Sequence, residues 1–206
     1  MNFQHISTDY RLILASESPR RKSLLRQINL PFHAVPSHVE ENQIEGKPSV
    51  KVSLLAENKA RAVHPEFNSS WILGADTIVV IGEEILGKPH DHHDAESMLY
   101  LLRGREHEVI TGFCLLNPEG DIAQTEAVTT LVRMKSLAAD EIKAYIATGE
   151  PFGKAGSYAI QGIGAFMVES ISGSYTNVVG LPVCALIKSL LAVGALRNFP
   201  LSPQWI

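Results

Sequence analysis

The chain has 206 residues, of which 45% are hydrophobic and 19% charged, and a formal net charge of −4. This length allows one well-cored α/β domain and is too short for two full-sized ones. Because acidic side chains outnumber basic ones, 22 to 18, the chain lacks the basic excess that non-specific nucleic-acid binding requires. No segment approaches ~18 uninterrupted apolar residues and no leader pattern opens the chain, so we expect neither a membrane partner nor export.

Two cysteines, Cys114 and Cys184, lie far apart in the sequence and in no metal or redox spacing. We interpret both as small buried side chains, as expected in a reduced cytoplasm.

The first elements predict a β-α-β unit, in which apolar strands over 12–15 and 31–35 flank a helix over 19–28. Ser18 fits the N-cap of that helix. Arg20 and Arg21 follow in its first turn, where the partial positive charge of a helix N-terminus disfavours them. The pattern indicates that an anion binds here, and a phosphorylated ligand is the natural candidate. The alternative is a pair of solvated surface arginines.

A second helix is expected over 49–63, after a polar loop over 37–47. Lys59 falls on its apolar face. Such a lysine either extends to the edge of the protein or points at a negative charge.

Asp76 interrupts a strong apolar strand that runs over 71–81 and ends in a hairpin turn at 82–83. An ionised carboxylate there is costly without a cation, a metal or a hydrogen-bond donor. The alternative is that Asp76 caps a bulge at Gly74.

The later elements follow from the same patterns. We expect helices over 91–103 and 138–148, a long hairpin over 109–134, a glycine-rich stretch over 153–164, a strand over 166–171, a turn at 173–175, a last helix after Pro182, and a loosely docked tail over 198–206.

Glu40 and Glu41 follow the second strand, at the carboxyl end where open α/β sheets bind their ligands. Together with Asp76 they would form an oxygen-rich site for Mg²⁺ or Mn²⁺. The alternative is a solvated acidic loop. His90, His92 and His93 are interpreted as a solvated cluster at a helix cap.

Six motifs occur in one order over residues 12–195: Leu14-Ala-Ser-Glu-Ser-Pro-Arg-Arg-x-x-Leu-Leu25, Leu55-Ala-x-x-Lys-Ala60, Gly74-Ala-Asp-Thr77, Gly87-Lys-Pro89, Lys154-Ala-Gly-Ser-Tyr-Ala-Ile-Gln-Gly162 and Gly173-Ser-Tyr…Val179-Gly-Leu-Pro182. Together they resemble the Maf family of nucleoside triphosphate pyrophosphatases. The resemblance implies one domain over 1–206 with a mixed central sheet flanked by helices, like inosine triphosphate pyrophosphatases, and a cytoplasmic homodimer.

The implied reaction converts a nucleoside triphosphate to the monophosphate and pyrophosphate with Mg²⁺ or Mn²⁺. The resemblance makes Asp76 the proton acceptor that activates water, puts Glu41 beside the metal with it, and places around the triphosphate Ser16, Arg21, Lys59 and Lys88.

The branch of the family that acts on dTTP and UTP typically has Arg, Thr and Gln at the positions of Arg20, Thr77 and Gln161. A neutral amide can pair with the carbonyl and N–H edge of uracil or thymine. The resemblance therefore predicts a dTTP and UTP pyrophosphatase, and it adds the removal of modified pyrimidine nucleotides as a further expected role. The alternatives are a nucleotide-binding regulator of cell division that lacks catalysis, a phosphatase or nucleotidyltransferase, and a pyrophosphatase for 7-methyl-GTP.

Overall fold

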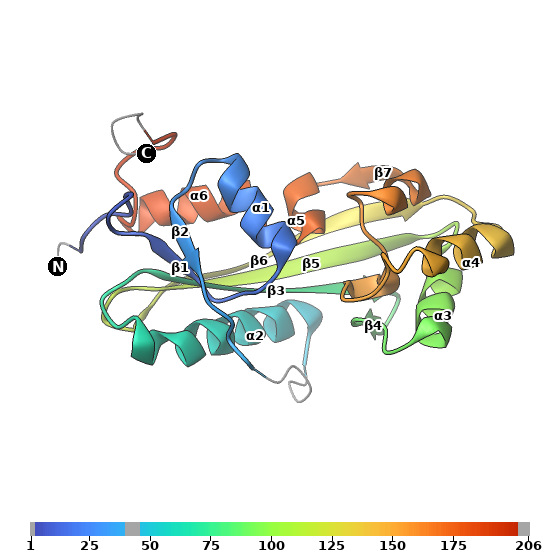
Figure 1. Ribbon diagram of the computed structural model, residues 1–206, viewed down its shortest axis with the longest axis horizontal. Helices are drawn as coiled ribbons and strands as arrows, with labels where there is room; N and C mark the ends of the chain where they lie inside the picture. The colour runs from blue at the N-terminus through green and yellow to red at the C-terminus, as the bar shows by residue number, and fades with distance from the viewer. Residues whose placement is uncertain (1–2, 40–45, 202–206) are drawn as a thin grey trace. The chain divides into compact units, whose positions relative to one another are not determined.

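The computed structural model describes residues 3–39 and 46–201 (Figure 1). Within these residues a seven-stranded sheet has the order β2-β1-β3-β5-β6-β7, and β4 pairs with β3. Parallel and antiparallel pairs both occur, so the predicted mixed sheet with helices is confirmed. The chain divides into two compact units, unit 1 (1–76, 111–128 and 180–206) and unit 2 (77–110 and 129–179). That residues 1–206 act as one domain stays a prediction.

Unit 1 contains the predicted β-α-β opening. Strand β1 (Leu12–Leu14) runs parallel to both β2 (Phe32–Ala34) and β3 (Ile72–Ile81). Helix α1 (Pro19–Gln27) connects β1 to β2, and the Ser18 hydroxyl accepts the N–H of Arg21 as the predicted cap. Helix α2 (Pro48–Val63) covers one face of this part of the sheet, and α1 and α6 (Val183–Ala192) cover the other (Figure 1).

Two glycines allow α2 to lie directly on the sheet. A Cβ on Gly74 of β3 would come within 1.9 Å of the Ala56 carbonyl oxygen, and one on Gly112 would come within 2.6 Å of the Val52 carbonyl carbon. Both contacts are with helix backbone, which cannot move aside as a flexible side chain can. Glycine at these positions therefore brings α2, and Lys59 on it, close to β3.

Unit 2 contains the far ends of the long strands. Strand β4 (Glu84–Leu86) returns antiparallel to the end of β3, and β7 (Val168–Ser172) lies antiparallel to β6 (Ile122–Met134). Strand β5 (Glu106–Leu116) lies between β3 and β6 in the sheet. The unit also contains three helices: α3 (His92–Leu102), α4 (Ala139–Ala147) and α5 (Tyr175–Val179). Short 3₁₀ segments lie at Ala155–Ser157 and Ile163–Met167 in unit 2 and at His64–Glu66 in unit 1.

The structure corrects three details of the sequence analysis. The turn expected at 173–175 runs into the short helix α5, and the strand expected from 166 begins at Val168 because 163–167 form a 3₁₀ segment. Cys114 is buried as predicted, but Cys184 is exposed on α6. In the described part of the chain, none of the helices has the length and apolarity needed to cross a membrane.

Candidate active site

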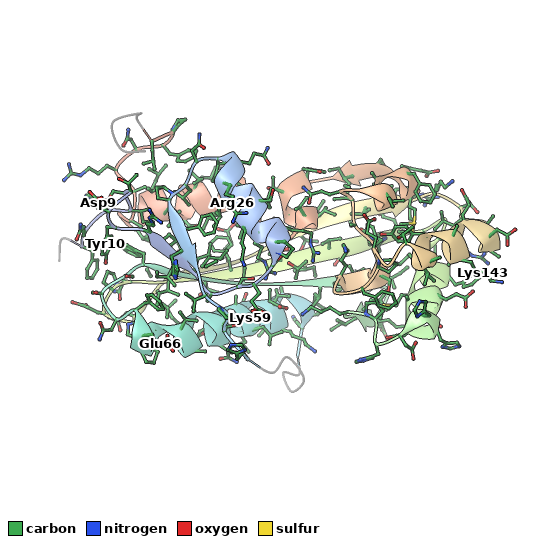
Figure 2. The ribbon with its side chains drawn as sticks, viewed as in Figure 1. Asp9, Tyr10, Arg26, Lys59, Glu66 and Lys143 are labelled. Carbon is green, nitrogen blue, oxygen red and sulfur yellow. The ribbon has the colours of Figure 1, made fainter. Side chains whose placement is uncertain are left out.

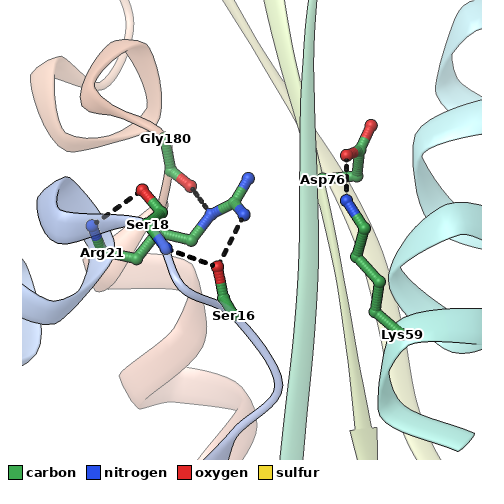
Figure 3. A network of polar contacts seen from close by, with 6 residues as sticks. All are labelled: Ser16, Ser18, Arg21, Lys59, Asp76 and Gly180. Carbon is green, nitrogen blue, oxygen red and sulfur yellow. Dashed lines mark hydrogen bonds and ion pairs between the residues drawn. The ribbon is translucent and has the colours of Figure 1, made fainter. Parts of the chain in front are cut away.

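A buried ion pair joins α2 to β3 in unit 1. The Nζ of Lys59 donates to Oδ1 of Asp76 at 2.7 Å, and the two side chains are 8% and 9% exposed (Figures 2 and 3). Residues on the same helix face, among them Ala56, Ala60 and Val63, join the hydrophobic core of unit 1. The apolar pattern of α2 therefore brings a single cation against the one carboxylate that interrupts β3.

This ion pair decides between the two interpretations that the sequence allows for Lys59 and the two that it allows for Asp76. Lys59 points at a negative charge, so the interpretation of a lysine extending to the protein edge is wrong. Strand β3 continues unbroken through Asp76, and Gly74 is needed for the approach of α2 rather than for a bulge. In Figure 3 the second oxygen of Asp76 points away from Lys59.

A second polar cluster in unit 1 surrounds Arg21. Its Nε donates to the carbonyl of Gly180 at 2.8 Å, and its Nη1 donates to Oγ of Ser16 at 3.2 Å (Figure 3). The same Ser16 hydroxyl accepts the N–H of Ser18, which caps α1. Arg21 is 8% exposed, so the alternative of a solvated surface arginine is wrong for this residue. The guanidinium fixes the loop that leads from β1 into α1.

Arg20 is half-buried beside it in the sequence, and burial lowers the pKa of its guanidinium from the ordinary value. An arginine keeps its charge under such a shift. The first turn of α1 therefore carries two partly or fully desolvated cations.

The remaining predicted residues belong to unit 2 or lie outside the described residues. Thr77 is half-buried in β3, directly after Asp76, and Lys88 is exposed two residues after β4. Gln161 is half-buried in the segment between the 3₁₀ turns of unit 2. Glu40 and Glu41 lie outside the described residues, so their predicted place beside a metal stays a prediction.

The segment that carries Gln161 is bound by two side chains that the sequence analysis passed over. Oη of Tyr145 donates to Oε2 of Glu150 at 2.8 Å and accepts the N–H of Ala159 at 3.2 Å. Burial and then the Glu150 carboxylate raise the pKa of the Tyr145 hydroxyl. Burial alone would raise the pKa of Glu150, but backbone N–H groups and the Tyr145 hydroxyl lower it overall. No local sequence pattern marks Tyr145 or Glu150 for this role, because their backbone partners lie more than ten positions along the chain.

His107 and Tyr158 form another buried polar contact in unit 2. Nε2 of His107 lies 2.7 Å from Oη of Tyr158, and the side chains are 2% and 5% exposed. Burial lowers the pKa of His107 to about 4 and raises the pKa of Tyr158. His107 is therefore a neutral ring at pH 7, and it holds the same glycine-rich segment three residues before Gln161.

Metal-ligating side chains do not gather in the parts of the chain that the structure describes: no group of three or more His, Cys, Asp or Glu occurs there. His90, His92 and His93 are exposed, as expected for the solvated cluster that the sequence predicts. Asp76 offers carboxylate oxygens, the donor type that Mg²⁺ and Mn²⁺ prefer.

These features define a mixed α/β protein with desolvated arginines at the start of α1 and a buried Lys59–Asp76 ion pair between α2 and β3. The comparison with known proteins identifies the family: residues 11–193 match the Maf-like proteins, and the chain belongs to the Maf family. It is 54% identical to the dTTP/UTP pyrophosphatase of Ruminiclostridium cellulolyticum, covering 84% of this chain and 90% of that protein. It is 50% identical to the dTTP/UTP pyrophosphatase of Syntrophotalea carbinolica, covering 93% and 88%.

Among solved structures, the chain resembles the nucleoside-triphosphatase / dITP/XTP pyrophosphatase of Mycobacterium abscessus, with a TM-score of 0.41, 12% identity and coverage of 62% and 75%. It also resembles the Ham1 protein of Staphylococcus aureus, with a TM-score of 0.43, 16% identity and coverage of 60% and 71%. The family assignment does not depend on these weaker likenesses.

Proposed function

We propose that this member of the Maf family hydrolyses dTTP and UTP to the monophosphate and pyrophosphate. The observation that carries the proposal is the 50–54% identity, over most of both chains, to relatives named dTTP/UTP pyrophosphatase. The buried pair of Lys59 and Asp76 supports it independently, because binding a nucleotide does not require a carboxylate desolvated in this way. That pair favours a catalyst over a regulator that only holds nucleotides.

In the proposed reaction Asp76 is the general base. Its Oδ1 is held by Lys59, and the other oxygen takes a proton from the attacking water. The water oxygen becomes a phosphate oxygen as the bridge between the α- and β-phosphates breaks. Lys59 offsets the charge of the buried carboxylate and keeps it oriented.

The triphosphate brings about four negative charges, and cations aimed at the developing charge stabilise the transition state. We assign this role to the side chains of Lys59, Lys88 and Arg21. Ser16, in the loop before α1, is assigned to the triphosphate site beside Arg21. The desolvation of Arg21 and Arg20 supports the assignment, because desolvated guanidinium groups bind phosphate more strongly than solvated ones.

The proposed metal is Mg²⁺ or Mn²⁺, with Asp76 and Glu41 as its protein ligands. The donor chemistry of Asp76 fits such a hard cation. When bound, the metal would neutralise phosphate charge and lower the pKa of a bound water.

Base choice is assigned to Arg20, Thr77 and Gln161, following the resemblance to the dTTP and UTP branch. A neutral amide and a hydroxyl fit the polar edge of uracil and thymine, whereas a cationic 7-methylguanine calls for a carboxylate. From the family we also propose that the protein is cytoplasmic and forms a homodimer. Light scattering on the purified protein measures its mass in solution and so tests the dimer.

The experiment that tests the function is a substrate panel with the products identified. We expect dTTP and UTP to yield monophosphate and pyrophosphate at least ~30-fold more efficiently, by kcat/KM, than ATP, GTP and 7-methyl-GTP, since two unpaired hydrogen bonds cost that much. Release of orthophosphate would instead identify a phosphatase, and preference for 7-methyl-GTP would overturn the proposed base choice.

A further inference from the structure

Gln161 lies in a backbone segment that two side chains of unit 2 hold from both sides. Before it, the N–H of Ala159 donates to Oη of Tyr145. After it, the N–H of Ile163 donates to Oε1 of Glu150 at 3.1 Å, and the N–H of Gly164 donates to Oε2 at 2.8 Å. Tyr145 and Glu150 are themselves joined by the 2.8 Å hydrogen bond, so the three backbone contacts belong to one network.

The packing around this network is tight enough to require glycine. Gly162 has a φ of 77°, and a Cβ there would lie 2.2 Å from Oε1 of Glu150. A Cβ on Gly164 would lie 2.7 Å from Oη of Tyr145. The residue after Gln161 therefore lies directly against the carboxylate, and the segment has little room to shift.

The hydrogen bonds of this network are also strengthened by burial and by an ionised acceptor. Tyr145 is 2% exposed, Gly164 is buried, and the acceptor at the centre is a carboxylate whose pKa is lowered by the N–H groups that it accepts. Hydrogen bonds to an ionised acceptor are roughly twice as strong as neutral ones. The Lys154 ammonium group donates to the backbone carbonyl of Glu150, which fixes that residue from its other side.

Base selection by an amide requires such fixation. A glutamine side chain can present either its carbonyl or its NH₂ group, so a mobile one pairs with the edge of uracil or with the inverted donor and acceptor pattern of cytosine. Discrimination between these two bases of equal size therefore depends on where the amide lies relative to the base, and the backbone that carries Gln161 sets that position.

We propose that Glu150 and Tyr145 are positioning residues for base choice, holding the backbone around Gln161 so that its amide accepts uracil and thymine and rejects cytosine. This inference rests on the proposed function, in which Gln161 contacts the base. Neither residue touches the substrate in this proposal.

The test compares kcat/KM for UTP and CTP in wild type, Glu150→Gln and Tyr145→Phe. Both variants are expected to lower the UTP-to-CTP ratio at least about 5-fold, mainly because UTP loses its advantage. Glu150→Gln removes at least one hydrogen bond from the network, and Tyr145→Phe removes two. Glu150→Asp, which keeps the charge but withdraws the carboxylate by one methylene, is expected to do the same. Thermal unfolding identifies the variants that are folded under assay conditions.

Glu141→Gln is the matched control. Glu141 lies on α4 like Tyr145, but it accepts from Lys135 and from the N–H of Ala138, neither of which belongs to the segment that carries Gln161. We expect its UTP-to-CTP ratio to stay within about twofold of wild type. A purely structural role for Glu150 would lower kcat/KM for both nucleotides equally and leave the ratio unchanged, which would overturn the inference.

Gln161→Ala separates this inference from the function on which it rests. The expected result is a collapse of the ratio in Gln161→Ala and no further change when Glu150→Gln is added. If Gln161→Ala lowers the ratio while folded Glu150 and Tyr145 variants do not, the positioning role is wrong and the proposed base contact stands. If Gln161→Ala leaves the ratio unchanged, the base contact itself is wrong.

Discussion

The Nζ of Lys59 on α2 lies 2.7 Å from Oδ1 of Asp76 on β3, in a part of unit 1 where both side chains are less than a tenth exposed. Removing one member of such a pair leaves the other charge buried without compensation. The pair therefore couples the stability of unit 1 to the chemistry proposed for Asp76.

Replacing Lys59 by methionine should destabilise the protein by about 3–5 kcal/mol at pH 7, because Asp76 is then buried as an unpaired carboxylate. Urea unfolding measures the change. From the sequence alone, the loss of a lysine from an apolar helix face would be expected to cost little, and the ion pair reverses that expectation. Arg61→Met on the same helix is the control: Arg61 pairs with Glu57 at the surface, and its loss should cost less than ~1 kcal/mol. Equal effects in the two variants would contradict the account of the buried pair.

Acid should weaken the fold through His107. Its folded pKa of about 4 lies below the ordinary 6.5, so the unfolded chain takes up a proton first as the pH falls. The contribution to stability is complete above pH 6.5 and declines as the pH falls from there to about 4, with a loss of about 2 kcal/mol between pH 7 and pH 5.

His107→Gln, which cannot titrate, isolates this contribution from that of the carboxylates. The free energy of unfolding should fall between pH 7 and pH 5 in both proteins. The fall should be about 2 kcal/mol smaller in His107→Gln than in wild type. Parallel declines in the two proteins would show that His107 is not held neutral.

Gly74→Ala should lower the free energy of unfolding by about 3 kcal/mol or more, because the new Cβ would lie 1.9 Å from the Ala56 carbonyl oxygen and α2 would have to move. Gly87→Ala is the control, since a Cβ there meets nothing within 4 Å. Thermal or urea unfolding gives both values. A fully stable Gly74→Ala protein would mean that α2 does not pack on β3 as closely as described.

Hydrolysis of UTP should stop in excess chelator and return with added Mg²⁺ or Mn²⁺, because carboxylates such as Asp76 and Glu41 bind hard cations. Pyrophosphate release is the measurement, with unfolding monitored in parallel to exclude loss of the fold. Undiminished turnover without divalent metal would remove the metal from the proposed reaction.

The sequence pattern within a single helix or strand was sufficient to predict features that depend on that helix or strand alone. The apolar period of α2 placed Lys59 inside, the interrupted strand marked Asp76 as needing a partner, and Ser18 was recognisable as a cap. That Lys59 and Asp76 are each other's partner was not predicted, because the pairing depends on how α2 lies across β3.

Contacts between distant parts of the chain escaped prediction for the same reason. The carbonyl that holds Arg21 belongs to Gly180, 159 positions away in the sequence. Glu150 looked like an ordinary residue after a helix end, and only the folded chain shows that it accepts the N–H groups of Ile163 and Gly164. Helix α5 was missed because five residues are too few for a periodic pattern.

The most direct test of the central claim is the turnover of UTP by Asp76→Asn, with released pyrophosphate as the readout. Asparagine keeps an oxygen that can accept the Lys59 N–H but cannot serve as a base at neutral pH. It leaves the Lys59 charge uncompensated, so stability should fall, and urea unfolding with circular dichroism identifies conditions in which the variant is folded. The account predicts a fall in kcat of at least ~10²-fold. A folded Asp76→Asn protein that still releases pyrophosphate from UTP at a near-normal rate would contradict it.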